Sequence, residues 1–319
     1  MADHPVSTAP LENVLISNGD CSVTIDPRLG GKIASISVRG HELLQPPLAP
    51  CAPRTPTQPF DESDASGWDE CLPSVASCAI QTPSGPVSIP DHGDLWRVPW
   101  ELLNSSSMCA AFRACCFSLP LELRRATTLL TSESGWRLRA DYLLTNTGDV
   151  PVPWSWAAHP LFTAEAGDRI LLPASIRALR LEGSGGGRLG QPGDRIAWPV
   201  ATLATGGQTD LSLAQPPESA IGDKLFAGPL ETGENWCALE RVRLGLRIRV
   251  RFNPMATPYL GLWICYGGWP ARPGTKQTCV ALEPATAPVD SLAQTGPWSH
   301  TLAPGQSVSW PMIVEIESI

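Results

Sequence analysis

Two histidines and one glutamate stand at points where strand-like segments meet loops, and their side chains are suited to proton transfer. His159 lies in the segment AAHPLF, His92 in DHGDLW and Glu283 in LEPATAPVD. A carboxylate and an imidazole have ordinary pKa values of about 4.3 and 6.5, so near neutral pH one can accept a proton while the other donates one. Such a pair is typical of general acid–base catalysis.

Each of these residues also has a structural interpretation. His159 has apolar neighbours, and burial lowers the pKa of an imidazole unless a carboxylate compensates, so a core histidine is the alternative. His92 fits an exposed turn as well as a ring whose tautomer Asp91 or Asp94 fixes. Glu283 ends an apolar strand, where it is either a member of a partly buried ion pair or a base facing a pocket.

Tryptophan is the other clue to function, because the chain has 12 tryptophans and only 3 tyrosines. Sugar rings present apolar C–H faces that pack on indole, while their hydroxyl groups need polar or charged partners. A cleft of tryptophan, histidine and acidic side chains is therefore typical of a carbohydrate site, although core packing is the simpler explanation for at least half of the tryptophans. Those nearest the motifs are Trp68, Trp96, Trp154, Trp156, Trp263 and Trp269.

The composition excludes several classes of protein. Of the 319 residues, 43% are hydrophobic and 17% are charged, which indicates a globular chain. The net charge of −8 argues against a protein that binds nucleic-acid backbones, because such proteins need a basic excess. The chain has no apolar run of about 18 residues, and its first residues lack the features of a secretory signal, so we expect a cytoplasmic protein without membrane contact.

The 10 cysteines include no CxxC pair, and Cys115 and Cys116 are adjacent, which is a poor geometry for a bridge between them. In a long chain without an export signal we expect buried, reduced thiols rather than disulfides. No histidine is placed to complete a zinc site with the cysteines, so no structural metal is expected.

Alternation of apolar and polar residues with a period of two dominates the chain and predicts strands. It is clearest in RVRLGLRIRVRF (241–252) and WRLRADYLLTN (136–146). No segment predicts a long amphipathic helix, so we expect an all-β fold, an antiparallel β-sandwich with long loops and little helix. Further strand candidates are CSVTID, KIASISV, ALRLEG, CVALEP and VSWPMIVEI.

Two irregular segments interrupt the strands. Residues 45–67 are rich in proline and polar residues and predict a long surface loop. Residues 183–195 are rich in glycine, but no Gly-Lys-Ser/Thr follows, so they indicate a flexible connection rather than a phosphate loop. Neither segment divides the chain, and we expect an N-terminal tail (1–11) followed by a single domain (12–319).

The arginines of residues 243–251 alternate with apolar residues on one strand. They fit a solvated strand face paired with acidic neighbours better than a site for a phosphorylated ligand.

Five motifs occur in an order that resembles the aldose 1-epimerase (galactose mutarotase-like) superfamily, from about residue 12 to the C-terminus. They are GGKIASISVRGHELL, HGDLWRVPW, AAHPLF, DKLF and LEPATAPVDSL. The resemblance is to divergent bacterial members more than to the best-known galactose enzymes. It implies the supersandwich of that superfamily, a large antiparallel β-sandwich that binds the sugar in an open cleft on one sheet.

The resemblance also implies roles for particular residues. His159 falls on the general acid and Glu283 on the general base of the family. His92 falls on a histidine that contacts sugar oxygens, and Asp223 on a carboxylate that binds sugar hydroxyls. We also expect Trp263 to bind the sugar, as one of the tryptophans near these motifs. No metal or organic cofactor is needed for the reaction that the resemblance implies.

The sequence departs from the family in two places. GWDECLPS replaces the early Asn-Arg stretch, so Trp68, Asp69 and Glu70 are expected to take over contacts with the sugar ring. HGDLWR resembles the His-Gly-x-x-Arg motif of the hexose-6-phosphate mutarotases, with Arg97 displaced by one residue. A phosphate on the sugar therefore stays open.

These observations predict an aldose 1-epimerase whose partner is a monosaccharide, an aldose with or without a phosphate, and which acts as a monomer or weak homodimer. One alternative is a non-catalytic carbohydrate-binding or regulatory protein that uses the same cleft. Another is a sugar lyase or hydrolase. An inverting hydrolase requires two carboxylates about 6.5–9.5 Å apart, and Asp69 or Glu70 opposite Glu283 would supply them.

Overall fold

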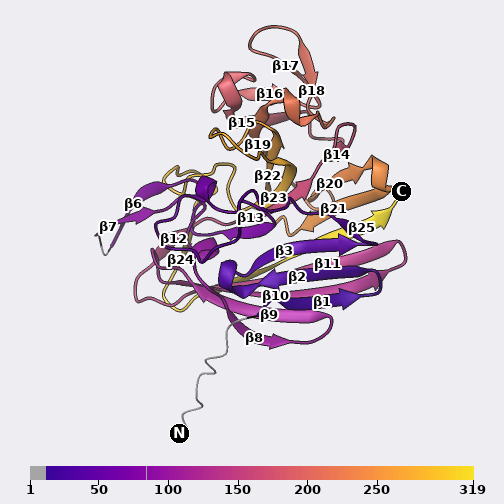
Figure 1. The fold of residues 1–319 in the computed structure, drawn as a ribbon. Coiled ribbons are helices and arrows are strands. Elements are labelled where there is room, and N and C mark those ends of the chain that lie inside the picture. Colours follow the sequence, from indigo (N-terminus) through magenta and orange to yellow (C-terminus); the bar gives the residue numbers. More distant parts are fainter. Residues whose placement is uncertain (1–11, 84) are drawn as a thin grey trace.

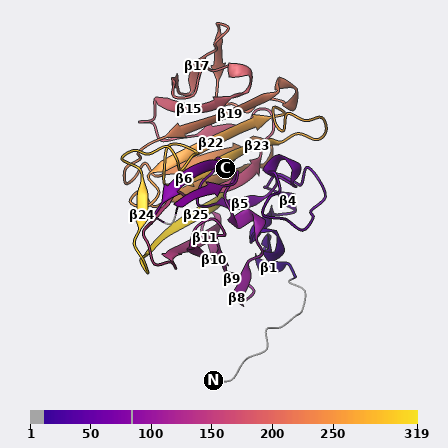
Figure 2. The same cartoon turned by 90° about the vertical axis from the view of Figure 1, so that its left-hand side faces the viewer.

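The computed structural model describes residues 12–83 and 85–319, so the tail expected over residues 1–11 lies outside the described residues. Within them, two large antiparallel sheets of 11 and 8 strands form a sandwich, and three two-stranded pairs lie at its margins (Figures 1 and 2). The described helical segments are short 3-10 turns, and none of them has the length and apolar character needed to cross a membrane. The predictions of an all-β sandwich and of little helix are confirmed.

The two large sheets draw their strands from distant parts of the chain. In spatial order the eleven-stranded sheet consists of β1 (Val14–Asn18), β2 (Cys21–Asp26), β3 (Lys32–Val38), β5 (Trp68–Cys71), β13 (Ala157–Thr163), β23 (Thr278–Ala285), β22 (Tyr259–Tyr266), β19 (Ile221–Ala227), β15 (Ala178–Ser184) and β16 (Arg195–Ala197), with β4 (His41–Glu42) paired to β3. The eight-stranded sheet consists of β14 (Arg169–Leu171), β20 (Trp236–Arg241), β21 (Leu246–Phe252), β25 (Ser307–Ser318), β11 (Gly135–Asn146), β10 (Leu121–Ser132), β9 (Cys109–Cys115) and β8 (Glu101–Ser105).

The remaining elements are short. The two-stranded pairs are β12 (Val152–Trp154) with β24 (His300–Leu302), β17 (Val200–Thr202) with β18 (Gln208–Asp210), and β6 (Cys78–Thr82) with β7 (Gly85–Ile89). The 3-10 turns are η1 (Pro27–Leu29), η2 (Phe60–Glu62), η3 (Leu95–Arg97), η4 (Gly185–Gly187), η5 (Pro217–Ser219) and η6 (Val242–Leu244).

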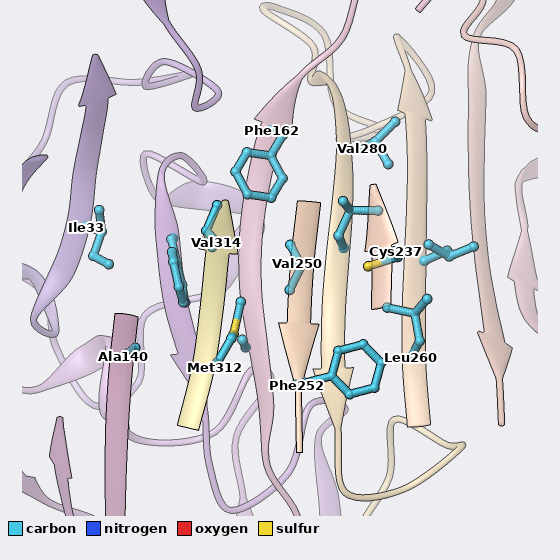
Figure 3. Packing of buried hydrophobic residues seen from close by; sticks show 14 of the residues in the cluster. Ile33, Ala140, Phe162, Cys237, Val250, Phe252, Leu260, Val280, Met312 and Val314 are labelled. Atoms are coloured by element: carbon cyan, nitrogen blue, oxygen red, sulfur yellow. The ribbon is translucent and has the colours of Figure 1, made fainter. Parts of the chain in front are cut away.

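The core lies between the inner faces of the two large sheets. Side chains alternate between the two faces of a strand, so every second residue points inward. Figure 3 shows Phe162 and Val280 of the eleven-stranded sheet in the same buried cluster as Val250 and Val314 of the eight-stranded sheet. Full burial of one such side chain contributes about 1.5–3 kcal/mol, so the apolar face of each sheet favours the sandwich. The outer face of the eleven-stranded sheet is left free for a site.

The predicted strands are found, with one error. The candidates beginning at Cys21 and Lys32 are β2 and β3, and the prediction for residues 136–146 is β11. The prediction of one strand over residues 241–252 was wrong in its first third, because β20 ends at Arg241 and β21 begins only at Leu246. Between them Gly245 takes a left-handed conformation (φ 63°), which favours glycine and closes the hairpin.

The arginines of β21 lie on the solvated face of the eight-stranded sheet. Arg247 pairs with Glu240 of the neighbouring β20, and Arg251 Nε lies 2.8 Å from Glu315 Oε2 of β25 on the other side. The interpretation as a strand face paired with acidic neighbours is confirmed.

The segment 45–67 connects β4 to β5, and the prediction of a surface loop holds only for its first part. Phe60 is 2% exposed, and residues 63–67 are buried. Buried ion pairs hold these residues in place, because the Asp64 carboxylate lies 3.1 Å from Lys32 Nζ and also pairs with Arg54. This half of the loop therefore packs against the sheet.

All 10 cysteines lie within the described residues, and all are free thiols, as expected. Burial was expected for them all, but Cys51 and Cys115 are exposed. Both stand at points where the chain leaves the sheets, in the loop after β4 and at the end of β9.

A buried ion pair joins the two large sheets. Arg125 Nη1 of β10 lies 2.9 Å from Glu70 Oε1 of β5, and neither side chain is exposed. The same carboxylate accepts hydrogen bonds from the Tyr142 hydroxyl (2.9 Å) and from Trp156 Nε1 (3.0 Å). Because all of its partners are fixed by the sandwich, this pair ties the sheets together.

We expect Arg125→Met to lower the free energy of unfolding by about 3–5 kcal/mol, because it leaves the Glu70 carboxylate buried without its counter-charge. Arg124→Met is the control, since Arg124 is 49% exposed and pairs with Glu122 at the surface, and it should cost less than about 1 kcal/mol. Urea unfolding followed by tryptophan fluorescence measures both. Equal losses in the two variants would contradict this role of the pair.

Candidate active site

The register of the eleven-stranded sheet gathers residues from distant segments into one row. His159 of β13 lies opposite Asp69 of β5, and Gly261 of β22 lies opposite both Glu283 of β23 and Phe226 of β19. The pairing of β13 with β23 completes the row by setting His159 beside Glu283. Directly opposite residues project from the same face of a sheet, so these side chains share the face turned away from the core.

A pocket of about 350 Å³ lies on this face, within the usual size range of small-molecule sites. It brings together three of the predicted site residues, His92, His159 and Trp263. The other lining residues are Phe60, Asp61, Val75, Ala76, Asp91, Lys224, Trp269, Gln277 and Asp290.

The predicted acid and base lie next to each other. His159 Nε2 is 3.9 Å from Glu283 Oε1, and Glu283 is only 1% exposed because it lies behind the lining residues. Burial, together with the nearby His92 and Lys224, lowers the pKa of His159 well below 6.5. Burial also raises the pKa of Glu283 above its ordinary value. The sequence-based expectation of ordinary pKa values for this pair does not describe the folded site.

Lys224 supplies the positive charge of the site. Its ammonium donates to Glu283 Oε2 and lies 3.4 Å from Asp290 Oδ1. Burial alone lowers the pKa of a lysine, but here Asp290 and Glu283 outweigh it and raise the pKa of Lys224. Lys224 is therefore charged, and it opposes the effect of burial on Glu283. Glu283 Oε1, on the side of His159, is buried without a hydrogen-bond partner in the described part of the chain.

His92 closes the pocket from a loop. Its backbone is left-handed (φ 59°), which is uncommon for a residue with a side chain, and its ring stacks on Phe60 with centroids 3.7 Å apart. His92 Nδ1 lies 3.0 Å from Asp91 Oδ2. Burial alone raises the pKa of Asp91, but the hydrogen bond and charge of His92 outweigh it and lower that pKa. The rings of His92 and His159 meet edge to face at 5.1 Å.

Two tryptophans and an amide form another wall of the pocket. Trp263 Nε1 donates to Gln277 Oε1 (2.9 Å), and Gln277 Nε2 donates to the carbonyl of Ala65 (3.0 Å). Trp269 packs against Phe60, with ring centroids 6.0 Å apart. The amide thus holds the Trp263 ring in place from behind.

Trp68 and Glu70 do not reach the pocket, because they project from the inner face of β5. Trp68 is fully buried in the main core, and Glu70 pairs with Arg125 inside the sandwich. Asp69 projects from the outer face but is 1% exposed, with its Oδ2 2.6 Å from Lys32 Nζ. Both carboxylates are held in buried ion pairs, with Lys32 and Arg125, so neither is available as the second carboxylate that an inverting hydrolase requires.

Asp223 and Arg97 also lie outside the pocket lining. Asp223 projects from the opposite face of β19 to Lys224 and accepts hydrogen bonds from Ser184 Oγ (2.6 Å) and from Arg188 Nε and Nη2 (2.9 and 2.7 Å). Arg97 is buried, and its guanidinium donates to the carbonyls of Gln58, Asp91 and Gly93. The Asp223 carboxylate and the Arg97 guanidinium therefore have hydrogen-bond partners within the fold itself.

Several lining residues were not predicted from the sequence. Lys224 is adjacent to the predicted Asp223, and strand alternation places the two on opposite faces, but only the pairing of Lys224 with Trp263 shows which of them faces the pocket. Asp290 ends the motif that contains Glu283 but received no role. Phe60 and Gln277 had no signal, because only long-range packing brings their segments to the pocket.

Residues suited to metal binding do not gather anywhere in the described part of the chain, where no three His, Cys, Asp or Glu side chains form a possible metal site.

The fold is similar to several solved structures. Slr1438 from Synechocystis sp. PCC 6803 matches with a TM-score of 0.73 and 18% identity over 100% of both chains. A galactose mutarotase-like protein from Lactobacillus casei matches with a TM-score of 0.68 and 16% identity over 96% of this chain and 100% of its own. A galactose mutarotase related enzyme from Lactobacillus acidophilus matches with a TM-score of 0.66 and 15% identity over 96% of this chain and 98% of its own.

This chain therefore has the galactose mutarotase-like sandwich fold, as the resemblance of its motifs implied. No protein-family model matches the sequence, and no curated protein is similar enough to count as a relative.

We expect the His159 imidazole to stay neutral in the folded protein below pH 6.5, the ordinary pKa of the residue. The unfolded chain then binds a proton that the folded chain does not, so the free energy of unfolding falls as the pH falls below 6.5, by at most about 1.4 kcal/mol per pH unit. His159→Asn removes this part of the pH dependence. NMR titration, with the resonance assigned by its loss in His159→Asn, measures the pKa, and a value at or above 6.5 would contradict the expectation.

Proposed function

We propose that this protein is an aldose 1-epimerase, which interconverts the α and β anomers of an aldose. The observation that carries the proposal is the 3.9 Å approach of His159 Nε2 to Glu283 Oε1 beside a tryptophan-lined pocket. The galactose mutarotase-like fold and the order of the motifs support the same reaction. Anomer exchange needs a proton acceptor and a proton donor close together, and this pair meets that requirement.

In the proposed reaction the Glu283 carboxylate removes the proton from the anomeric hydroxyl. The bond from C1 to the ring oxygen breaks as the C1 carbonyl forms, and protonated His159 gives its proton to the departing ring oxygen. Rotation about the C1–C2 bond then turns the other face of the aldehyde toward the ring oxygen. On reclosure His159 takes the proton back, and Glu283 returns its proton to the anomeric oxygen.

This cycle requires one proton on His159 and none on Glu283, and burial disfavours both charges. Lys224 changes the relative proton affinities of these two groups. It lowers the proton affinity of both groups, but it touches Glu283 directly, so its larger effect is to keep the carboxylate ionised. Because burial leaves His159 neutral in most molecules of the free protein, the cycle starts from the minor fraction in which the imidazole carries the proton.

The other lining residues fit a sugar ring. Trp263 and Trp269 offer apolar faces for the C–H groups of the ring, while His92, Asp61 and Asp91 offer partners for hydroxyls. Arg97 donates only to backbone carbonyls and so contributes no phosphate contact. The pocket lining therefore supports the binding of an aldose. Arg97, the arginine of the phosphosugar motif, does not contribute to that lining.

A second candidate function is non-catalytic carbohydrate binding, and one observation favours it. Glu283 is 1% exposed, and Lys224 occupies one of its two oxygens, so a bound sugar has limited access to the carboxylate. A binding protein with this site would bind an aldose saturably and leave its rate of anomer exchange unchanged.

We expect Glu283→Gln and His159→Asn each to lower kcat for anomer exchange by about 10²–10⁴-fold, because each removes one proton-transfer group. Polarimetry of freshly dissolved glucose and galactose measures the rate. Glu240→Gln, which changes a carboxylate on the other sheet, is the matched control and should retain the wild-type rate. If the wild type binds sugar but gives no acceleration, the second candidate function is correct; wild-type rates in both site variants would sink the proposed mechanism.

We expect Lys224→Met to move the acidic limb of the kcat/KM profile to higher pH by about 1–3 units, because Glu283 loses the cation that holds its pKa down. Lys276→Met is the control, since Lys276 donates to backbone carbonyls near the pocket and does not contact Glu283. The pH dependence of anomer exchange in the three proteins measures the shift. An unshifted profile of lower amplitude would indicate that Lys224 only supports the structure.

A further inference from the structure

A second hollow of about 500 Å³ lies on the same face of the eleven-stranded sheet as the proposed active site. Phe226 lines it and lies two residues beyond Lys224 on β19, so the two side chains project from the same face, with Lys224 Nζ 5.3 Å from the centre of the Phe226 ring. Arg180 of β15 lies opposite Phe226, and Arg195 of β16 lies opposite Arg180. The second hollow thus continues the row that contains Glu283 and His159.

The apolar part of this hollow consists of three aromatic side chains. Phe226 and Tyr259 belong to one buried cluster on the outer face, and the half-buried Trp298 packs against that cluster. The Tyr259 hydroxyl makes no hydrogen bond with the described part of the chain. Phe226 and Tyr259 are only 3% and 8% exposed, so Trp298 supplies most of the aromatic surface of the hollow, with the Tyr259 hydroxyl nearby.

The polar part consists of charged groups at the rim. Arg180 pairs with Glu182 and donates to the carbonyl of Pro288 (3.3 Å). Arg195 is exposed, and its guanidinium has no partner within residues 12–83 and 85–319. Within the described residues, the Asp194 carboxylate accepts one hydrogen bond, which comes from the backbone N–H of Gln191. Aromatic faces beside unused donors and acceptors suit a sugar ring, whose C–H faces stack while its hydroxyls form hydrogen bonds.

The two hollows are neighbours, although none of the described residues lines both. Pro288 lines the second hollow and Asp290 lines the first, and Glu182 contacts this segment through the backbone N–H of Asp290 (3.3 Å). Gly261 lies between Phe226 and Glu283. A Cβ at this position would lie 3.2 Å from both the Phe226 ring and the Glu283 carboxylate, so glycine lets these two side chains approach each other.

We propose that the second hollow is a glycosyl subsite, which binds the next sugar ring of a reducing oligosaccharide whose reducing-end aldose occupies the first pocket. This inference rests on the proposed epimerase function for the identity of the first site. The preferred substrate is then a reducing disaccharide or a longer oligosaccharide rather than a free monosaccharide.

The first test compares anomer exchange of glucose with that of laminaribiose, cellobiose, maltose and gentiobiose, which join two glucose units through different positions or, for cellobiose and maltose, with opposite anomeric configurations. We expect at least one disaccharide to have a kcat/KM above that of glucose. In Trp298→Ala the ratio of kcat/KM for that disaccharide to kcat/KM for glucose should fall by about fivefold to tenfold, since one stacking surface is lost. Trp236→Ala, on the other sheet, is the matched control and should keep the wild-type ratio.

An unchanged ratio in Trp298→Ala, or glucose as the best substrate of the panel, would overturn the subsite and leave the epimerase proposal standing. If no sugar is anomerised, the epimerase proposal fails and binding decides the subsite. Calorimetry with the methyl β-glycosides of the same disaccharides, which cannot open their rings, then serves as the readout. A Kd raised about fivefold to tenfold in Trp298→Ala supports the subsite, and equal Kd values in wild type and variant contradict it.

Discussion

The candidate site depends on one buried carboxylate and the positive charge beside it. Removing a carboxylate from water costs several kcal/mol, and Glu283 is tolerated in the sheet because the Lys224 ammonium compensates for its charge. The arrangement leaves Glu283 Oε1 without a hydrogen-bond partner on the side of His159, 3.9 Å away. Buried polar atoms are normally satisfied, so an unpaired oxygen at this position is well suited to receive a proton from a ligand.

The sheet register makes this contact possible. His159, Lys224 and Glu283 come from three strands far apart in the chain, and a β-sheet holds such residues at fixed positions on one face with little freedom. Gly261 contributes by lacking a side chain, since a Cβ there would lie 3.2 Å from the Glu283 carboxylate. The same row continues through Phe226 toward the second hollow, so one geometric device serves both sites.

Buried charges also fix the loops that complete the pocket. Lys32 lies between Asp64 and Asp69, at 3.1 and 2.6 Å, and so anchors the end of the loop that carries Phe60 to β5. Phe60 in turn stacks on His92 at the mouth of the pocket. Asp69 thus supports the walls of the site from behind. A buried network of ion pairs of this kind favours a single conformation of the loop.

The period-two pattern by itself determined the all-β class and the position of most strands, because it is a local consequence of alternating burial. The motifs also pointed to His159, Glu283 and His92, which the structure brings together at the pocket. Only the tertiary structure decided which face each neighbour takes. Asp223 and Lys224 are adjacent, yet one pairs with Arg188 and the other enters the pocket, because a shift of one residue reverses the face of a strand. The pKa of His159 was likewise beyond the sequence, since burial is a property of the assembled sandwich.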